Sequence, residues 1–275
     1  MADGPARRRA GVLGSPIAHS LSPTLHRAAY VSLALDWDYR GYEVDEARLP
    51  GFLAGLDATW AGLSLTMPLK ESVIGLLDSI DPVAAAVRAV NTVLPAEPKR
   101  RGTLAWHGTN TDVIGMVESL QRAGLAGRPT TASVIGAGAT ARSAVAALAL
   151  LGVTEVTVYA RRREAADDVA VVASTLGLAA HAAGPLPDAE ALSADVVVAA
   201  LPGDAGAPWA PLAPAASGAL LDVSYHPWPT ALASAWGSPV VASGRDLLLW
   251  QAVEQVRLMT GRDPDAEAMS AALPD

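Results

Sequence analysis

The chain of 275 residues is 51% hydrophobic and carries 28 acidic against 20 basic residues, for a formal net charge of −8. This charge argues against a general nucleic-acid or anionic-membrane surface, and no stretch has the apolar length of a membrane span. The absence of cysteine excludes disulfides and thiolate metal sites, and the five histidines lack ligand spacing, so we expect no metal. The length predicts two domains. Without a signal-peptide pattern, we expect a cytoplasmic monomer or homodimer.

The first third of the chain predicts alternating strands and helices. The strands are expected at 10–13, 37–44 and 60–66, and the helices at 24–35 and 46–56. This order is typical of a parallel α/β arrangement with crossover helices. Ser22 is predicted to cap the first helix, with Pro23 at the first helical position. Ser20 and Ser22 lie two residues apart at this helix entrance, which makes them candidates for holding a carboxylate.

Two residue types are scarce enough to rank candidates. Lys70 and Lys99 are the only lysines, and Asn91 and Asn110 the only asparagines. Lys70 follows the third predicted strand and is a cation that can release its proton near neutral pH, which arginine cannot. Thr66 lies at the same strand end, where parallel sheets build their sites. Drift in base composition produces the same scarcity, so it ranks these residues without proving a role.

The remainder of the chain continues the strand and helix pattern. We expect helices at 72–77, 82–87, 113–123, 144–151, 163–178 and 244–260, a turn between strands at 95–102, and strands at 106–108, 155–159, 195–201, 219–223 and 239–242. Asp112 precedes the helix at 113–123, where a first-turn acid also favours the helix dipole without any catalytic role.

Residues 133–142 predict a strand that ends in a Gly-Ala-Gly turn and opens into a helix. Gly136 permits the sharp turn, Gly138 lets a phosphate approach the backbone, and Ala141 lets the helix lie close to the strand. A tight turn without a ligand fits the same pattern. Arginines 161–163 follow the next strand, where a fold that prefers NAD carries an acid. Guanidinium groups suit a 2′-phosphate, so NADP is favoured over NAD, against a merely solvated charge run.

Several motifs in the same order resemble the shikimate dehydrogenase family over essentially the whole chain. They are the loop Gly14–His26, Thr66–Lys70, Val90–Thr92, Asn110–Gly115, Asp222–Thr230 and Gly244–Gln251. The resemblance implies an α/β substrate domain (1–107 and 244–275), to which the C-terminal helices return, and a Rossmann-type NADP domain (108–243). It also implies a small-molecule substrate, shikimate or 3-dehydroshikimate.

The resemblance assigns roles to individual residues. By resemblance, the substrate carboxylate is held by Ser20, Ser22 and Tyr225. Ring hydroxyls are bound by Thr66, Lys70, Asn91, Asp112 and Gln251, with Lys70 and Asp112 as the catalytic pair. The cofactor is contacted by Gly136, Gly138, Ala139, Arg161, Arg162 and Gly244.

The sequence departs from the family pattern at a few positions. Ser64 replaces the usual asparagine, Ala139 replaces a second adjacent glycine, and other losses cluster on the cofactor side, although Arg161 is retained. The expected reaction is the reversible NADPH-dependent reduction of 3-dehydroshikimate to shikimate in chorismate biosynthesis. The alternatives are a quinate or aminoshikimate dehydrogenase that uses NAD or NADP, and a non-catalytic dinucleotide-binding regulator.

Overall fold

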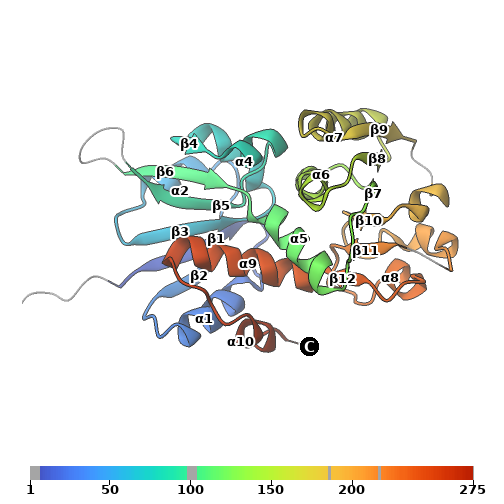
Figure 1. Ribbon diagram of the computed structural model, residues 1–275. Helices are drawn as coiled ribbons and strands as arrows, with labels where there is room; N and C mark the ends of the chain where they lie inside the picture. Colours follow the sequence, from blue (N-terminus) through green and yellow to red (C-terminus); the bar gives the residue numbers. More distant parts are fainter. Residues whose placement is uncertain (1–6, 98–103, 185–186, 216–217, 275) are drawn as a thin grey trace, which may run out of the picture. The chain divides into compact units, whose positions relative to one another are not determined.

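The computed structural model describes residues 7–97, 104–184, 187–215 and 218–274, and its chain divides into two compact units. Unit 1 comprises Met1–Thr111 and Gln251–Asp275, and unit 2 comprises Asp112–Trp250. The second division falls inside the long helix α9 (Gly244–Thr260). Each unit contains one six-stranded sheet among the described residues, so each has its own core (Figure 1).

The sheet of unit 1 has the strand order β2-β1-β3-β5-β6-β4. Its strands are β1 (Arg9–Gly14), β2 (Asp38–Glu43), β3 (Trp60–Leu65), β4 (Ser79–Ile80), β5 (Thr92–Ala96) and β6 (Ala105–Thr109). The parallel arrangement predicted for the first three strands is confirmed, but β5 runs antiparallel to both β3 and β6. The reason is the short 97–104 connection from β5 to β6, since a parallel crossover needs a dozen or more residues. Most of this connection lies outside the described residues.

Helices cover both faces of this sheet. They are α1 (Ser22–Ser32), α2 (Leu49–Ala54), α3 (Leu69–Ser72), α4 (Pro82–Val87), the second part of α9 and α10 (Ala266–Ala271). Alternation along the strands assigns the faces. Leu63 and Leu65 of β3 belong to the core with α2 and α3, whereas Val12 of β1 joins Tyr30 of α1 and Met259 of α9. The C-terminal helices therefore return to the N-terminal part of the chain, as predicted.

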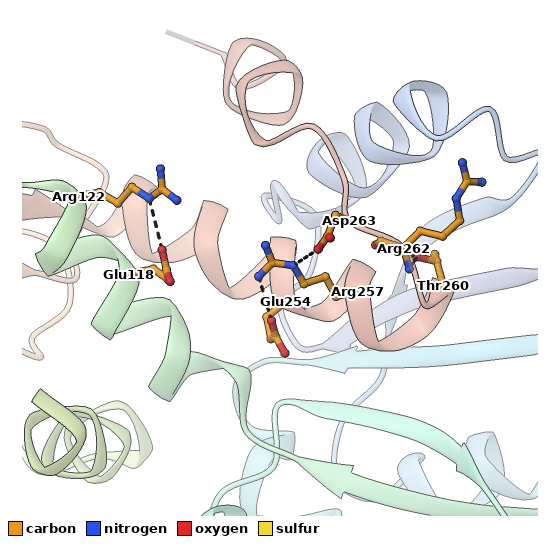
Figure 2. A network of polar contacts seen from close by, with 7 residues as sticks. All are labelled: Glu118, Arg122, Glu254, Arg257, Thr260, Arg262 and Asp263. Carbon is orange, nitrogen blue, oxygen red and sulfur yellow. Dashed lines mark hydrogen bonds and ion pairs between the residues drawn. The ribbon is translucent and has the colours of Figure 1, made fainter.

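The C-terminal end of α9 is fixed by charged contacts on its exposed side. The Arg257 guanidinium pairs with Glu254 one turn earlier, at 3.4 Å, and with Asp263 beyond the helix, at 2.5 Å (Figure 2). The Thr260 hydroxyl donates to the carbonyl of Val256 and accepts from the N–H of Arg262. These contacts define where α9 ends and how the chain leaves it toward α10.

Unit 2 has the Rossmann-type order β12-β11-β10-β7-β8-β9, and the neighbouring strands of its described residues are all parallel. The strands are β7 (Thr131–Ile135), β8 (Glu155–Tyr159), β9 (Ala179–Ala183), β10 (Val196–Ala199), β11 (Ala219–Asp222) and β12 (Val241–Ser243). The helices are α5 (Thr111–Arg122), α6 (Ala139–Leu151), α7 (Arg163–Thr175), α8 (Ala231–Ala235) and the first part of α9. Right-handed crossovers place α6 and α7 on one face of the sheet and α8 on the other (Figure 1).

The α/β fold class is confirmed, but two details of the prediction are wrong. The helix predicted to reach residue 178 ends at Thr175, and β9 follows. The sequence of β9 is alanine-rich and carries little β propensity, so it offered no strand signal. Ser22 does not cap α1 with its side chain, because the helix already includes Ser22 and Leu21 takes the N-cap position without a side-chain hydrogen bond. No helix among the described residues is long and apolar enough to cross a membrane.

Candidate functional site

Three predicted substrate residues, Thr66, Lys70 and Asn91, gather where β3 ends. The Leu65 N–H donates to the carbonyl of Asn91 at 2.7 Å, and the Val90 N–H donates to the carbonyl of Lys70 at 2.8 Å. Lys70 lies on the short helix α3, and Asn91 immediately precedes β5. Main-chain hydrogen bonds therefore bring together segments that lie twenty or more residues apart in the sequence. Asn91 is buried, whereas Thr66 and Lys70 are partly exposed.

The side-chain amide of Asn91 is held in one orientation. Its Oδ1 accepts from the Thr111 N–H at 2.7 Å and from the Thr92 hydroxyl at 2.8 Å. A backbone N–H can only donate, so the atom facing it must be the amide oxygen. The amide nitrogen is consequently the group that Asn91 can offer to a ligand oxygen.

The loop after β1 carries Ser20 and Ser22 and is fastened to β2. Glu43 accepts from the Ser15 hydroxyl at 2.6 Å and from the Ile17 N–H at 2.9 Å. These two hydrogen bonds lower the pKa of the Glu43 carboxyl below its ordinary value, and the bond from Ser15 has the larger effect. The Ser20 hydroxyl accepts from the Ser22 N–H at 3.4 Å, so the two serines are neighbours at the start of α1.

The other predicted substrate residues lie on three further elements. Asp112 is buried in the first turn of α5, in unit 2, and Gln251 is buried on α9, in unit 1. Tyr225 follows β11 in unit 2, and 41% of its surface is exposed. The predicted catalytic pair, Lys70 and Asp112, is thus contributed by both units.

The loop that carries Tyr225 is anchored by a buried carboxylate. Asp222 accepts from the Thr230 hydroxyl at 2.6 Å and from the Ser224 N–H at 3.1 Å. Burial raises the pKa of Asp222, and these hydrogen bonds oppose that rise. Thr230 in turn accepts from Ala233 and caps α8. Both ends of the segment 222–230 are therefore fixed to the frame of unit 2.

Unit 2 contains a cavity of about 830 Å³ at the carboxyl ends of β7 and β8. Its lining includes Gly136, Gly138, Arg161, Arg162 and Trp209. Gly136 has a φ of +120°, and a side chain there would collide with the carbonyl oxygen of Ala200. Gly138 faces open space and is the N-cap of α6. The turn therefore requires glycine at 136, while the bare backbone at 138 leaves room for a bound group.

The three consecutive arginines separate into two kinds. Arg161 and Arg162 line the cavity, but Arg163 is not among its lining residues and pairs with Asp167 one turn along α7 at 3.2 Å. Ala139 and Gly244 also lie outside the lining. Gly244 begins α9, and a side chain there would collide with the carbonyl of Val223, so its structural requirement is close packing.

Within the residues that the structure describes, no group of three or more His, Asp or Glu side chains is arranged to hold a metal ion. The side chains at the end of β3 offer hydroxyl, amide and ammonium groups, a donor set that suits a polyhydroxylated organic ligand.

Comparisons with known proteins agree with this geometry. A family model described as the shikimate dehydrogenase substrate binding domain matches residues 12–93, and one described as the shikimate 5'-dehydrogenase C-terminal domain matches residues 244–273. A protein named shikimate dehydrogenase (NADP(+)) from Anaeromyxobacter sp. (strain Fw109-5) is 35% identical, over 96% of this chain and 94% of its own. The chain belongs to the shikimate dehydrogenase family.

Solved structures of the shikimate dehydrogenase family share the fold along the whole chain. The crystal structure of the Mycobacterium tuberculosis shikimate dehydrogenase is 40% identical, with a TM-score of 0.86 over 96% of this chain and 98% of that one. A shikimate 5-dehydrogenase from Thermus thermophilus, solved in complex with NADP(H) and shikimate, is 33% identical, with a TM-score of 0.81 over 96% and 98% of the two chains.

Sequence reasoning about this shikimate dehydrogenase family member missed several residues that hold the site. Glu43 fastens the serine loop, Thr92 fixes the Asn91 amide, and Gln255 contacts both Thr92 and the Asn91 carbonyl. One signal was present, because Gln255 lies four residues after Gln251 and therefore on the same face of α9. Glu43 offered no signal, since it acts through contacts that only the fold creates, and Thr92 was visible only as the last residue of the Val90–Thr92 motif.

Proposed function

We propose that this chain is a shikimate dehydrogenase that interconverts 3-dehydroshikimate with NADPH and shikimate with NADP, and so serves chorismate biosynthesis. The observation that carries the proposal is that Thr66, Lys70 and Asn91 lie together at the end of β3. Relatives named shikimate dehydrogenase (NADP(+)) match this chain over nearly its full length. The reaction oxidises the C3 hydroxyl of shikimate to a ketone. The hydride passes to NADP, and the hydroxyl proton passes to the protein or to solvent.

The unit 2 cavity fits the cofactor. The turn at Gly136 and Gly138 leads into α6, whose first N–H groups are suited to a phosphate, and the volume of about 830 Å³ admits a dinucleotide portion. Arg161 and Arg162 are placed on the lining, where their guanidinium groups suit a 2′-phosphate. When bound, NADP supplies the hydride chemistry. We assign residues 108–243 to cofactor binding, with Ala139 and Gly244 shaping the turn and the start of α9.

Residues 1–107 and 244–275 form the proposed substrate domain. We propose that Ser20 and Ser22, together with Tyr225, hold the substrate carboxylate, because hydroxyl donors near a helix N-terminus suit an anion. Thr66, Asn91, Asp112 and Gln251 bind ring hydroxyls. The Asn91 amide oxygen is already taken by Thr111 and Thr92, so its nitrogen donates to a ring oxygen.

Lys70 handles the proton at the C3 oxygen. In the reducing direction its ammonium group donates to the oxygen that becomes the hydroxyl, and in the oxidising direction its neutral amine accepts that proton. Asp112 is the paired carboxylate and binds a ring hydroxyl beside it. Proton transfer by a positioned side chain contributes about 100-fold or more to turnover.

The test follows nicotinamide absorbance with shikimate and quinate, each supplied with NADP and with NAD. The proposal expects reduced cofactor with shikimate and NADP and the highest kcat/KM for that combination. A higher kcat/KM with quinate or with NAD moves the protein to the related dehydrogenases. Folded protein that is silent with every combination identifies a non-catalytic dinucleotide-binding protein instead.

A further inference from the structure

We infer that Gln255 is a positioning residue for the reaction: acting through Thr92, and together with the Thr111 N–H, it holds the Asn91 amide in the orientation that meets the substrate. The inference deepens the proposed function and rests on it. Gln255 is 1% exposed and lies on α9, behind the site residues. Its effect on a ligand therefore has to pass through another side chain.

A chain of hydrogen bonds runs from the core to Asn91. The Tyr39 hydroxyl donates to Ser64 at 2.6 Å, and Ser64 donates to the Gln255 Oε1 at 2.7 Å. The Gln255 Nε2 continues the chain to the Thr92 hydroxyl at 3.0 Å, and Thr92 donates to the Asn91 Oδ1 at 2.8 Å. Ser64 and Thr92 each accept from one neighbour and donate to the next, so the donor direction is the same throughout.

The orientation of the Gln255 amide is unambiguous. Its Nε2 also lies 3.3 Å from the carbonyl oxygen of Asn91, which can only accept, so this atom must be the nitrogen. Its Oε1 accepts a second hydrogen bond, from the His26 Nε2, at 3.1 Å. With two donors and two acceptor sites all engaged, a buried glutamine has a single favourable orientation.

The packing around Gln255 supports this role. His26 stacks on Tyr39 at 3.9 Å, and full burial lowers the pKa of His26 to about 4, so at neutral pH it is an uncharged donor to Gln255. On β3, Gly62 and Ser64 face α9, and a side chain at Gly62 would press on Met259. The small side chains at positions 62 and 64 thus let α9 pack close enough to β3 for Gln255 to contact Thr92.

Ion pairs on the opposite side of α9 help to fix the position of the helix. Glu254 and Arg257 lie on either side of Gln255 in the sequence but face outward, and Arg257 binds Asp263 beyond the helix end (Figure 2). Charged contacts fix one side of α9 and the fully hydrogen-bonded Gln255 fixes the other, so Gln255 stays in place to donate to the Thr92 hydroxyl, which also contacts the Thr111 hydroxyl at 3.2 Å. The Asn91 amide oxygen then stays bound to Thr92 and Thr111, and this sets the direction of the amide nitrogen.

The kinetic test compares variants that break this chain with matched controls. Gln255→Met keeps the volume and removes all four contacts, and Thr92→Val removes only the linking hydroxyl. Each is expected to lower kcat/KM for shikimate about tenfold, because the Asn91 amide loses part of the support that holds it in the orientation the transition state needs. The KM for NADP stays unchanged. Thr92→Ser, which keeps the hydroxyl, restores the value.

Two further variants separate positioning from general destabilisation. Val256→Ala truncates a fully buried neighbour on α9 without touching a polar atom, and it should lower stability but not kcat/KM. In an Asn91→Ala background, Gln255→Met should cost little more, since its effect passes through Asn91. Multiplicative losses in the double variant, equal losses in Thr92→Ser and Thr92→Val, or a matching loss in Val256→Ala overturn the inference.

A spectroscopic readout does not depend on activity. Because Asn91 and Asn110 are the only asparagines, selective ¹⁵N labelling gives two side-chain amide pairs. Gln255→Met and Thr92→Val should shift the Asn91 pair and leave the Asn110 pair in place, while Val256→Ala shifts neither. An unmoved Asn91 pair overturns the inference even if shikimate is turned over. A wild-type protein inactive with shikimate overturns the proposed function, and the spectra still report whether Gln255 holds Asn91.

Discussion

The two units prepare their binding sites in opposite ways. In unit 1, the Asn91 amide is buried, and its orientation is fixed by the Thr111 backbone N–H and by the buried Thr92 hydroxyl, which is itself hydrogen-bonded to Gln255. In unit 2, the cavity is formed by a glycine turn and by the exposed arginines 161 and 162. A small ring with several hydroxyls needs donors in set directions, whereas a phosphate is bound by backbone N–H groups and mobile charges.

This contrast predicts where substitutions are costly. In unit 1, a change behind the site reaches the substrate through a chain of contacts. In unit 2, each arginine acts separately, so changes should be smaller and confined to the cofactor.

Lys70→Ala should have the largest effect on turnover. Loss of the proton-transferring group is expected to lower kcat by about 100-fold or more. Because Lys70 belongs to unit 1, the affinity for NADP, measured by fluorescence titration of NADPH, should stay the same. Unchanged kcat would remove Lys70 from the chemistry, and a parallel loss of NADPH binding would place its role in the cofactor site.

Acid should weaken the buried network of unit 1. The pKa of His26 falls from 6.5 to about 4 on burial, so the folded state excludes a proton that the unfolded chain binds. The resulting stability is present above about pH 6.5 and is lost as the pH falls toward 4, by roughly 3 kcal/mol. Tyr30 and Tyr39, which pack against His26, keep their protons in this range because burial raises both pKa values.

The measurement for His26 is urea unfolding between pH 7 and pH 4, in the wild type and in His26→Gln. The glutamine keeps a donor for Gln255 but does not titrate. We expect the acid-dependent loss to shrink in the variant by most of that amount. Equal losses in the two proteins would show that His26 is not the group responsible.

In unit 2, a pair of glycines tests the turn itself. Gly136→Ala should destabilise the protein by about 1–3 kcal/mol or more, since its φ of +120° disfavours a side chain and the Ala200 carbonyl blocks it. Gly138→Ala meets open space and loses only the N-cap preference of glycine over alanine, about 1 kcal/mol or less. Thermal unfolding of both variants decides, and equal losses would contradict the geometry.

The arginine run offers the smallest and most selective change. We expect Arg161→Ala or Arg162→Ala, whichever removes the arginine that binds the 2′-phosphate, to raise the KM for NADP about tenfold. The KM for NAD should change little. Arg163→Ala is the matched control, because this arginine pairs with Asp167 outside the cavity lining. A KM increase for NADP in Arg163→Ala as large as in the other two would reject the division of the run.

Much of this architecture could be predicted from local sequence patterns. Short apolar or alternating runs located β1, β3 and the strands of the Rossmann-type unit other than β9, and the Gly136 turn located the cavity, because these features depend on residues close together in the chain. The turn between strands expected at 95–102 is the short connection that makes β5 antiparallel to β6, but the sequence did not predict that β5 also runs antiparallel to β3.

The candidate site divides in the same way. Lys70 and Asn91 stood out by residue type, and the structure brings them together. Gln255 and Glu43 did not, because a glutamine on a helix or a glutamate on a strand is ordinary until the partner across the fold is known. Ser64 stood out only as a departure from the family pattern, and its hydrogen bond to Gln255 was not predicted. The sequence identifies residues that contact a ligand more readily than it identifies the residues that orient those ligand-contacting side chains.

The most direct test of the assignment of substrate to unit 1 and cofactor to unit 2 is amide hydrogen exchange, measured with shikimate alone and with NADP alone. The account predicts that shikimate slows exchange at the end of β3 and in the loop after β1, around Thr66, Asn91 and Ser20. NADP should slow exchange in the turn around Gly136 and at the end of β8. Protection of the Gly136 turn by shikimate, or of the β3 end by NADP with that turn unaffected, would contradict the assignment of substrate and cofactor to separate units.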